Sequence, residues 1–287
     1  MLIFKVVFSL SICILFQLVF AGSVFAWGPA IHTVIACRII DVANHLLPPI
    51  ASIIQSFSLE YVYGSMAADF FVGKGQKNRK GHSHNWETGF RLLSEAVDER
   101  EAAYAYGFFS HLAADVVAHN YFVPGLIHRV STWKRMGHLY SEAIADYFVG
   151  SFYMRIARDI LSMEQLDCDH LLTSAVGKSR NGLRARRHIF TQSVKLSDYI
   201  YCSPPMILLN IGFRYGISNE YLDSMINISY RLVKDFLTNT DSSLCLSYDP
   251  IGSQNLRLAR RKGIFSKLFK IPRPVCRFPV DQELLEL

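Results

Sequence analysis

The chain of 287 residues has no pair of cysteines separated by two residues, which argues against a zinc site built from thiolates. It has no run of alternating apolar and polar residues typical of half-buried strands, and no internal repeat. Apolar residues recur instead at steps of three and four. This pattern predicts an all-α protein, a single multi-helix bundle with helices over residues 31–47, 60–72, 86–96, 101–121, 138–161, 184–199 and 219–237.

The N-terminal 26 residues differ from the rest of the chain. One cation, Lys5, precedes an apolar stretch over residues 6–20, and small residues follow up to Ala26. This is typical of a secretory signal peptide cleaved before Trp27, with an uncleaved membrane anchor as the alternative. Cleavage predicts a secreted or periplasmic protein. In that oxidising compartment at most two intrachain disulfides can form among Cys37, Cys168, Cys202, Cys245 and Cys276.

The C-terminal region is basic. Residues 256–270 hold six cations and no acid, which equals the net charge of +6 of the whole chain. We therefore divide the protein into the signal peptide (1–26), a helical domain (27–240) and a basic tail (241–287). Cations interleaved with Leu, Ile and Phe favour a surface helix that contacts anionic lipid; a solvated tail and a nucleic-acid contact are the alternatives.

The sequence HLAADVVAH places His111, Asp115 and His119 at four-residue intervals in an apolar helix. Each step advances about one turn and rotates only about 40° around the axis, so the three side chains share one face. Any one of them alone is explained by hydrogen bonding in a core. Buried charges persist, however, when they are paired or bound to a metal.

Further candidate ligands surround this helix in the sequence. Histidine nitrogens and carboxylate oxygens are the ligands of zinc sites that keep a position open for water, whereas calcium prefers oxygens alone. Cleavage before Trp27 would add a free α-amine, a nitrogen ligand that a peptide bond cannot supply. The full set has nine members, which is too many for one metal and suits three: Trp27, His32, Asp69, His84, His111, Asp115, His119, His138 and Glu142.

In this order, the set resembles the zinc-dependent phospholipase C family, which is related in fold to the zinc-dependent single-strand nucleases. Both have a mature N-terminal Trp, a nearby His, an Asp followed by a His, an HxxxD helix, a further His, and a final HxxxE or HxxxD. The resemblance covers about residues 27–161 and implies three zinc ions. It groups the ligands as Asp69, His84, His111 and Asp115; as His119, His138 and Glu142; and as Trp27, His32 and Asp115.

Two positions depart from the family pattern. The sequence HSH offers both His82 and His84, of which we prefer His84 because it directly precedes the predicted helix start at WETG. His119 comes slightly earlier than the family's next histidine, so either a shifted helix turn carries His119 to the metals or His128 replaces it.

Grouped zinc ions favour hydrolysis of phosphate esters. The resemblance implies that Asp69 acts as general base as well as ligand. Glu142 and the basic tail favour a phospholipid substrate, with apolar residues of the 121–137 loop docking on the bilayer. The alternatives are a single-strand nuclease, in which Trp86, Tyr121 or Trp133 would stack on bases, and a non-catalytic, membrane-associated metal-binding protein.

Overall fold

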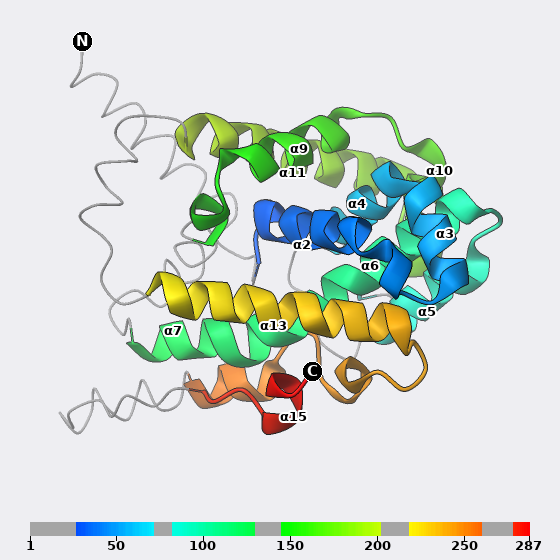
Figure 1. Cartoon of the computed structure of the whole chain (residues 1–287). Coiled ribbons are helices and arrows are strands. Elements are labelled where there is room, and N and C mark those ends of the chain that lie inside the picture. The colour runs from blue at the N-terminus through cyan, green and yellow to red at the C-terminus, as the bar shows by residue number, and fades with distance from the viewer. Residues whose placement is uncertain (1–26, 72–81, 130–144, 202–217, 260–277) are drawn as a thin grey trace, which may run out of the picture.

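The computed structural model describes residues 27–71, 82–129, 145–201, 218–259 and 278–287, and this part of the chain contains helices and no strand (Figure 1). The prediction of an all-α fold is confirmed. The α-helices are α2 (Pro29–Asp41), α3 (Pro48–Ser56), α4 (Ser58–Ala67), α5 (Trp86–Glu95), α6 (Glu99–Val117), α7 (Val123–Arg129), α9 (Ser151–Ser162), α10 (Leu166–Val176), α11 (Arg180–Tyr201), α13 (Asn219–Thr238) and α15 (Gln282–Leu285). Short turns of other helix types are η1 (Ala43–His45), η2 (Ala68–Phe71), η3 (Ala118–Phe122) and η4 (Leu244–Ser247).

Helix α6 forms the centre of the bundle. Its last three turns are buried on every side, and α4, α5, α13, α2 and α3 all pack against it. Helix α2 lies between α13 and the antiparallel pair of α9 and α11 (Figure 1). A helix that is apolar all round is a core helix, so polar side chains on α6 need partners inside the protein.

Local sequence signals set the start of the helices that carry the site. Asn85 caps α5, since its side chain accepts a hydrogen bond from the amide of Glu87. Asp98 caps α6 in the same way through the amide of Glu101. Gly28, which precedes α2, has no side chain to do so, and the carboxylate of Asp146 accepts the amide of Ile31 instead, at 3.1 Å.

Two glycines allow α4 and α6 to cross in backbone contact. A Cβ atom added to Gly64 would lie 2.1 Å from the carbonyl oxygen of Tyr104, and one added to Gly107 would lie 2.0 Å from that of Tyr61. Neither helix could approach the other as closely with any larger residue at these positions. The crossing brings the Ser65 carbonyl to α6.

Several predicted boundaries are wrong. The helix predicted to end at residue 121 continues through η3 into α7, which contains Pro124, because the side chain of Asn255 donates to the Asn120 carbonyl that Pro124 cannot serve. The helix predicted over 138–161 is interrupted at Gly150, where φ is +90°, and α2 ends at Asp41 instead of residue 47. Pro48, which follows the helix predicted over 31–47, opens α3, where a first-turn proline is favourable.

The described apolar residues of the predicted docking loop are buried. Tyr121, Phe122 and Leu126 are at most 5% exposed, so this part of the membrane-docking prediction is wrong, and residues 130–137 lie outside the described ranges. Cys37, Cys168 and Cys245 are free thiols, whereas Cys202 and Cys276 are outside those ranges. Among the described residues, no helix is both long and apolar enough to cross a bilayer.

Candidate metal centre

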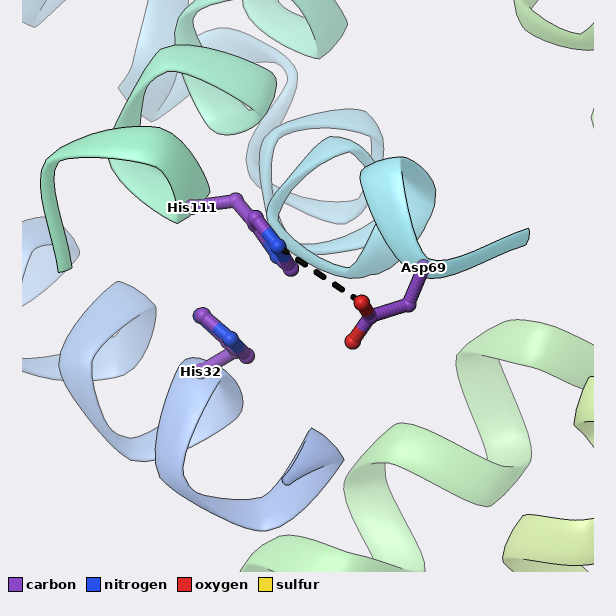
Figure 2. Close-up of side chains that lie close together, drawn as sticks. All are labelled: His32, Asp69 and His111. Atoms are coloured by element: carbon purple, nitrogen blue, oxygen red, sulfur yellow. Dashed lines mark ion pairs between the residues drawn. The ribbon is translucent and has the colours of Figure 1, made fainter. Parts of the chain in front are cut away.

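Six buried side chains from five segments converge at one site on α6. Helix α6 supplies His111 and Asp115, and the remaining four come from α2, η2, the loop before α5, and η3: His32, Asp69, His84 and His119. None of the six is more than 8% exposed. Figure 2 shows three of them, with His32 and Asp69 reaching toward His111 from separate helices.

Asp115 lies at the centre of this cluster, and its two oxygens face different groups. Oδ2 is 3.3 Å from Nε2 of His111, 3.4 Å from Nε2 of His84 and 3.6 Å from Nε2 of His119. Oδ1 is 3.6 Å from Nε2 of His32. One carboxylate thereby connects all four imidazoles, which is the arrangement that a carboxylate bridging two metal ions needs.

The distances between donor atoms suit a tetrahedral zinc ion. Ligands at the usual zinc–nitrogen distance of 2.0–2.1 Å are separated by about 3.3 Å in a tetrahedron. Nε2 of His84 lies 3.2 Å from Nε2 of His111 and 3.3 Å from Oδ1 of Asp69. His84, His111 and Asp115 form one compact trio of donors, and His32, Asp69 and His111 form a second.

Main-chain contacts fix the orientation of His111. Its Nδ1 lies 2.8 Å from the carbonyl oxygen of Ser65, which can only accept, so Nδ1 carries the proton and donates. When His111 is neutral, Nε2 carries the electron pair and faces Asp115 and Asp69, as in metal-binding histidines whose second nitrogen is hydrogen-bonded. The ring also stacks on His32, with centroids 3.9 Å apart.

Charges in the cluster depend strongly on one another. Burial opposes a charge on His111, but the carboxylates of Asp115 and Asp69 outweigh it and raise its pKa to about 9. Burial also opposes a charge on Asp115, yet His111 and His119 hold the pKa of this carboxyl well below its usual range. Burial and the neighbouring His111 lower the pKa of His32 well below its usual value.

Three buried polar atoms in the cluster have no hydrogen-bond partner: Nε2 of His32, Oδ1 of Asp115 and Nδ1 of His119. Leaving such atoms unpaired costs free energy, about 1–3 kcal/mol each, so a site that keeps them usually binds something there. The cluster contains only imidazole and carboxylate donors. These residues therefore fit zinc.

The sequence left two choices of ligand open, and the structure decides the one for which it describes both side chains. His84 lies in the cluster, whereas the half-buried His82 accepts the backbone amide of His84 through Nδ1. The side chain of His119 is in the cluster, and η3, which carries it, is a π turn that interrupts the regular α spacing. His138, Glu142 and the side chain of His128 lie outside the described residues.

Trp27 is fully buried at the start of α2. Its indole nitrogen donates to the carbonyl of Ala114, at 3.2 Å, and to the hydroxyl of Ser229, at 3.1 Å. Ala114 precedes Asp115, so the side chain of Trp27 is anchored beside the centre of the cluster.

Sequence reasoning missed two groups that position the ligands. Ser65 acts through its backbone carbonyl, which no sequence motif reveals. Asp146 caps α2, the helix that carries His32, and burial raises its pKa to about 7. One available signal was its spacing, one helical turn after Glu142.

One comparison with known proteins gives a match, and the matched region includes the cluster. A family model described as zinc-dependent phospholipase C matches residues 31–182, which are 152 of the 287 residues. Comparisons with curated proteins and with solved structures returned no match. The matched region contains His32, Asp69, His84 and the three candidate ligands of α6 and η3. The chain therefore belongs to the zinc-dependent phospholipase C family.

Proposed function

We propose that this protein is a zinc-dependent phospholipase C, which hydrolyses the glycerol-side phosphodiester bond of phospholipids and releases diacylglycerol and a phosphorylated headgroup. Family membership supports the coarser description, a hydrolase of the phosphodiesterase type that uses zinc. The observation that carries the proposal is the convergence of four imidazoles and two carboxylates on one buried site with unpaired donor atoms.

In this proposal the cluster holds three zinc ions. Asp69, His84, His111 and Asp115 hold one, and His119 with His138 and Glu142 holds another. The third is held by His32, Asp115 and the backbone of Trp27, whose α-amine becomes free on export and cleavage. Asp115 supports separate first and third sites, since Oδ1 faces His32 and Oδ2 faces His84 and His111. Zinc, when bound, polarises phosphoryl oxygens and lowers the pKa of water.

The protein's own residues orient the ligands and hold or accept protons. Asp69 is the proposed general base: it is 4% exposed, and Oδ1 of its carboxylate lies 3.3 Å from Nε2 of His84 and 3.8 Å from Nε2 of His111. The Ser65 carbonyl keeps the proton of His111 on Nδ1, directed away from the reaction. The apolar core of α6 excludes bulk water behind the cluster and strengthens these interactions.

Packing of two aromatic residues favours phospholipid over single-stranded nucleic acid. Tyr121 is 3% exposed and its hydroxyl donates to Asp281, so its ring is not available to stack on a base. Trp86 already packs on Phe109 and Phe236, whose own centroids are 4.7 Å apart. Trp133 lies outside the described residues. The basic residues 256–270 would contact the anionic membrane surface, and export would place the enzyme in the periplasm or outside the cell.

Product analysis and zinc content together test the proposal. Protein starting at Trp27 is loaded with zinc and given phosphatidylcholine vesicles or single-stranded DNA, with and without a chelator. We expect chelator-sensitive diacylglycerol and phosphocholine. Chelator-sensitive nucleotides would assign the protein to the nuclease branch. Bound zinc without either product would indicate a non-catalytic metal protein.

A matched pair of variants tests the bridging carboxylate. Asp115→Asn should remove at least one zinc equivalent and lower activity by at least about 100-fold, because even partners of ligands contribute 10–100-fold. Asp169→Asn is the control: Asp169 is also buried, but it pairs with Tyr63 and Arg187 away from the cluster. Full zinc content and activity in Asp115→Asn would refute the bridging role.

A further inference from the structure

Residues 248–255, which lie outside the region matched by the family model, pack directly on the π turn that carries His119. Gly252 has φ of +59°, and a Cβ atom added to it would lie 2.2 Å from the carbonyl oxygen of His119 and 2.9 Å from its Cβ. The two backbones are therefore in contact, with no room for a side chain between them.

Hydrogen bonds join the same segment to the residue after His119. The side-chain amide of Asn120 donates to the carbonyls of Val116 and Asp249, both at 2.9 Å. Asn255 donates to the carbonyl of Asn120, also at 2.9 Å. In a regular helix that carbonyl would receive the amide of residue 124, but residue 124 is proline and has none. Asn255 thus replaces the donor that the helix lacks.

The other end of the segment holds the loop that carries His84. The indole nitrogen of Trp86, two residues after His84, donates to the carbonyl of Tyr248 at 2.9 Å. The turn between the two contacts is itself fixed, since the carboxylate of Asp249 accepts the amides of Ile251 and Ser253. One short segment thereby links the surroundings of two histidines of the cluster.

We propose that residues 248–255 are a positioning element that holds His119, and with it the zinc ion that His119 binds, in register with Asp115. The inference rests on the proposed function, because it takes His119 as a ligand. A π turn departs from the favoured helical path, so it persists where neighbouring groups satisfy it. Here those neighbours are Gly252, Asp249 and Asn255. If their contacts are lost, His119 should move away from the cluster while the rest of the bundle stays folded.

Gly252→Ala tests this contact, with Gly177→Ala as the matched control. Gly177 has a similar φ of +65° but nothing within 4 Å of an added Cβ, so both variants introduce the same backbone strain and only one displaces His119. We expect purified Gly252→Ala to contain one zinc equivalent fewer than wild type and Gly177→Ala to contain the wild-type number. The midpoint of thermal unfolding in excess chelator should fall in both variants, and further in Gly252→Ala, because its methyl group also meets the His119 carbonyl. Equal zinc content in the two variants would overturn the inference.

Asn255→Ala provides a test that does not depend on the folding of the glycine variant. It removes one hydrogen bond, and we expect zinc to transfer to a chromogenic chelator at least about tenfold faster for one equivalent. Asn227→Ala, which removes an exposed amide on α13, is the control. Unchanged transfer in Asn255→Ala would overturn the inference, whereas wild-type protein that binds no zinc would refute the proposed function itself.

Discussion

The crossing of α4 and α6 makes zinc binding depend on a residue that touches no ligand. Gly107 contacts the backbone of α4, and one turn later on the same helix His111 donates to the Ser65 carbonyl. The change Gly107→Ala would place a methyl group 2.0 Å from the carbonyl oxygen of Tyr61 and 2.9 Å from the amide nitrogen of Ser65. Because ordinary contacts between carbon and oxygen are about 3.3–3.6 Å, the helices must separate by roughly 1 Å or more.

Two opposing effects set the change in the free energy of unfolding of Gly107→Ala. Alanine is favoured over glycine within a helix by about 1 kcal/mol. Overpacking of a close contact costs about 1–3 kcal/mol, and the upper end applies here because the obstacle is backbone that cannot rotate away. We therefore expect a net loss of about 1–2 kcal/mol in the free energy of unfolding. Separation also stretches the 2.8 Å bond between His111 and Ser65, and loss of such a partner weakens metal affinity by about 10–100-fold.

Urea unfolding in the presence of a chelator measures the stability of Gly107→Ala, and a competition titration with a zinc indicator measures its affinity. Gly182→Ala is the control: Gly182 lies in the first turn of α11, where an added Cβ approaches only the side-chain hydroxyl of Ser179, at 3.1 Å. If Gly107→Ala were as stable as wild type and bound zinc with wild-type affinity, the contact between the helices would not be what orients His111.

The helical class and the ligand-bearing stripe could be predicted because both are local properties of the sequence. A period of 3.6 residues places His111 and Asp115 on one face of α6 wherever that helix lies in the fold, and the structure brings His119 to them from the π turn that follows. The apolar surroundings of Asp69 also indicated burial, and it is 4% exposed. No structural knowledge was needed for either inference.

Helix boundaries were harder to predict because proline has two meanings. It ends a helix when it falls in the interior and begins one when it falls in the first turn. Pro48 begins α3, and Pro124 is accommodated because Asn255, far along the chain, supplies the missing donor. The second case depends on a contact between residues 135 positions apart, which no sequence window contains.

The supports of the ligands could not be predicted for the same reason. The Ser65 carbonyl belongs to the backbone, so any residue at position 65 would present it. It reaches His111 only because α4 and α6 cross closely at two glycines. The π turn at His119 likewise depends on packing against residues 248–255. Metal ligands have distinctive side chains that a sequence reveals. The groups that orient them are often main-chain atoms, which every residue has.

Two further predictions concern Trp27 and the start of α2. Retaining Ala26 before Trp27 should block the α-amine as a ligand and lower the zinc content by one equivalent, measured by metal analysis; unchanged content would refute an N-terminal ligand. On the same extended, metal-free chain, Asp146→Asn should raise stability at pH 8 but not at pH 4, as measured by urea unfolding. Burial raises the pKa of Asp146 from 3.8 to about 7, so the unfolded state loses its proton first, and folding is progressively penalised as pH rises between these values. The penalty is then constant above pH 7, at most about 4 kcal/mol, and asparagine, which can still accept the amide of Ile31, avoids it. Equal stability of the two chains at pH 8 would mean that the carboxylate is charged at little cost, as it would be if a cation paired with it.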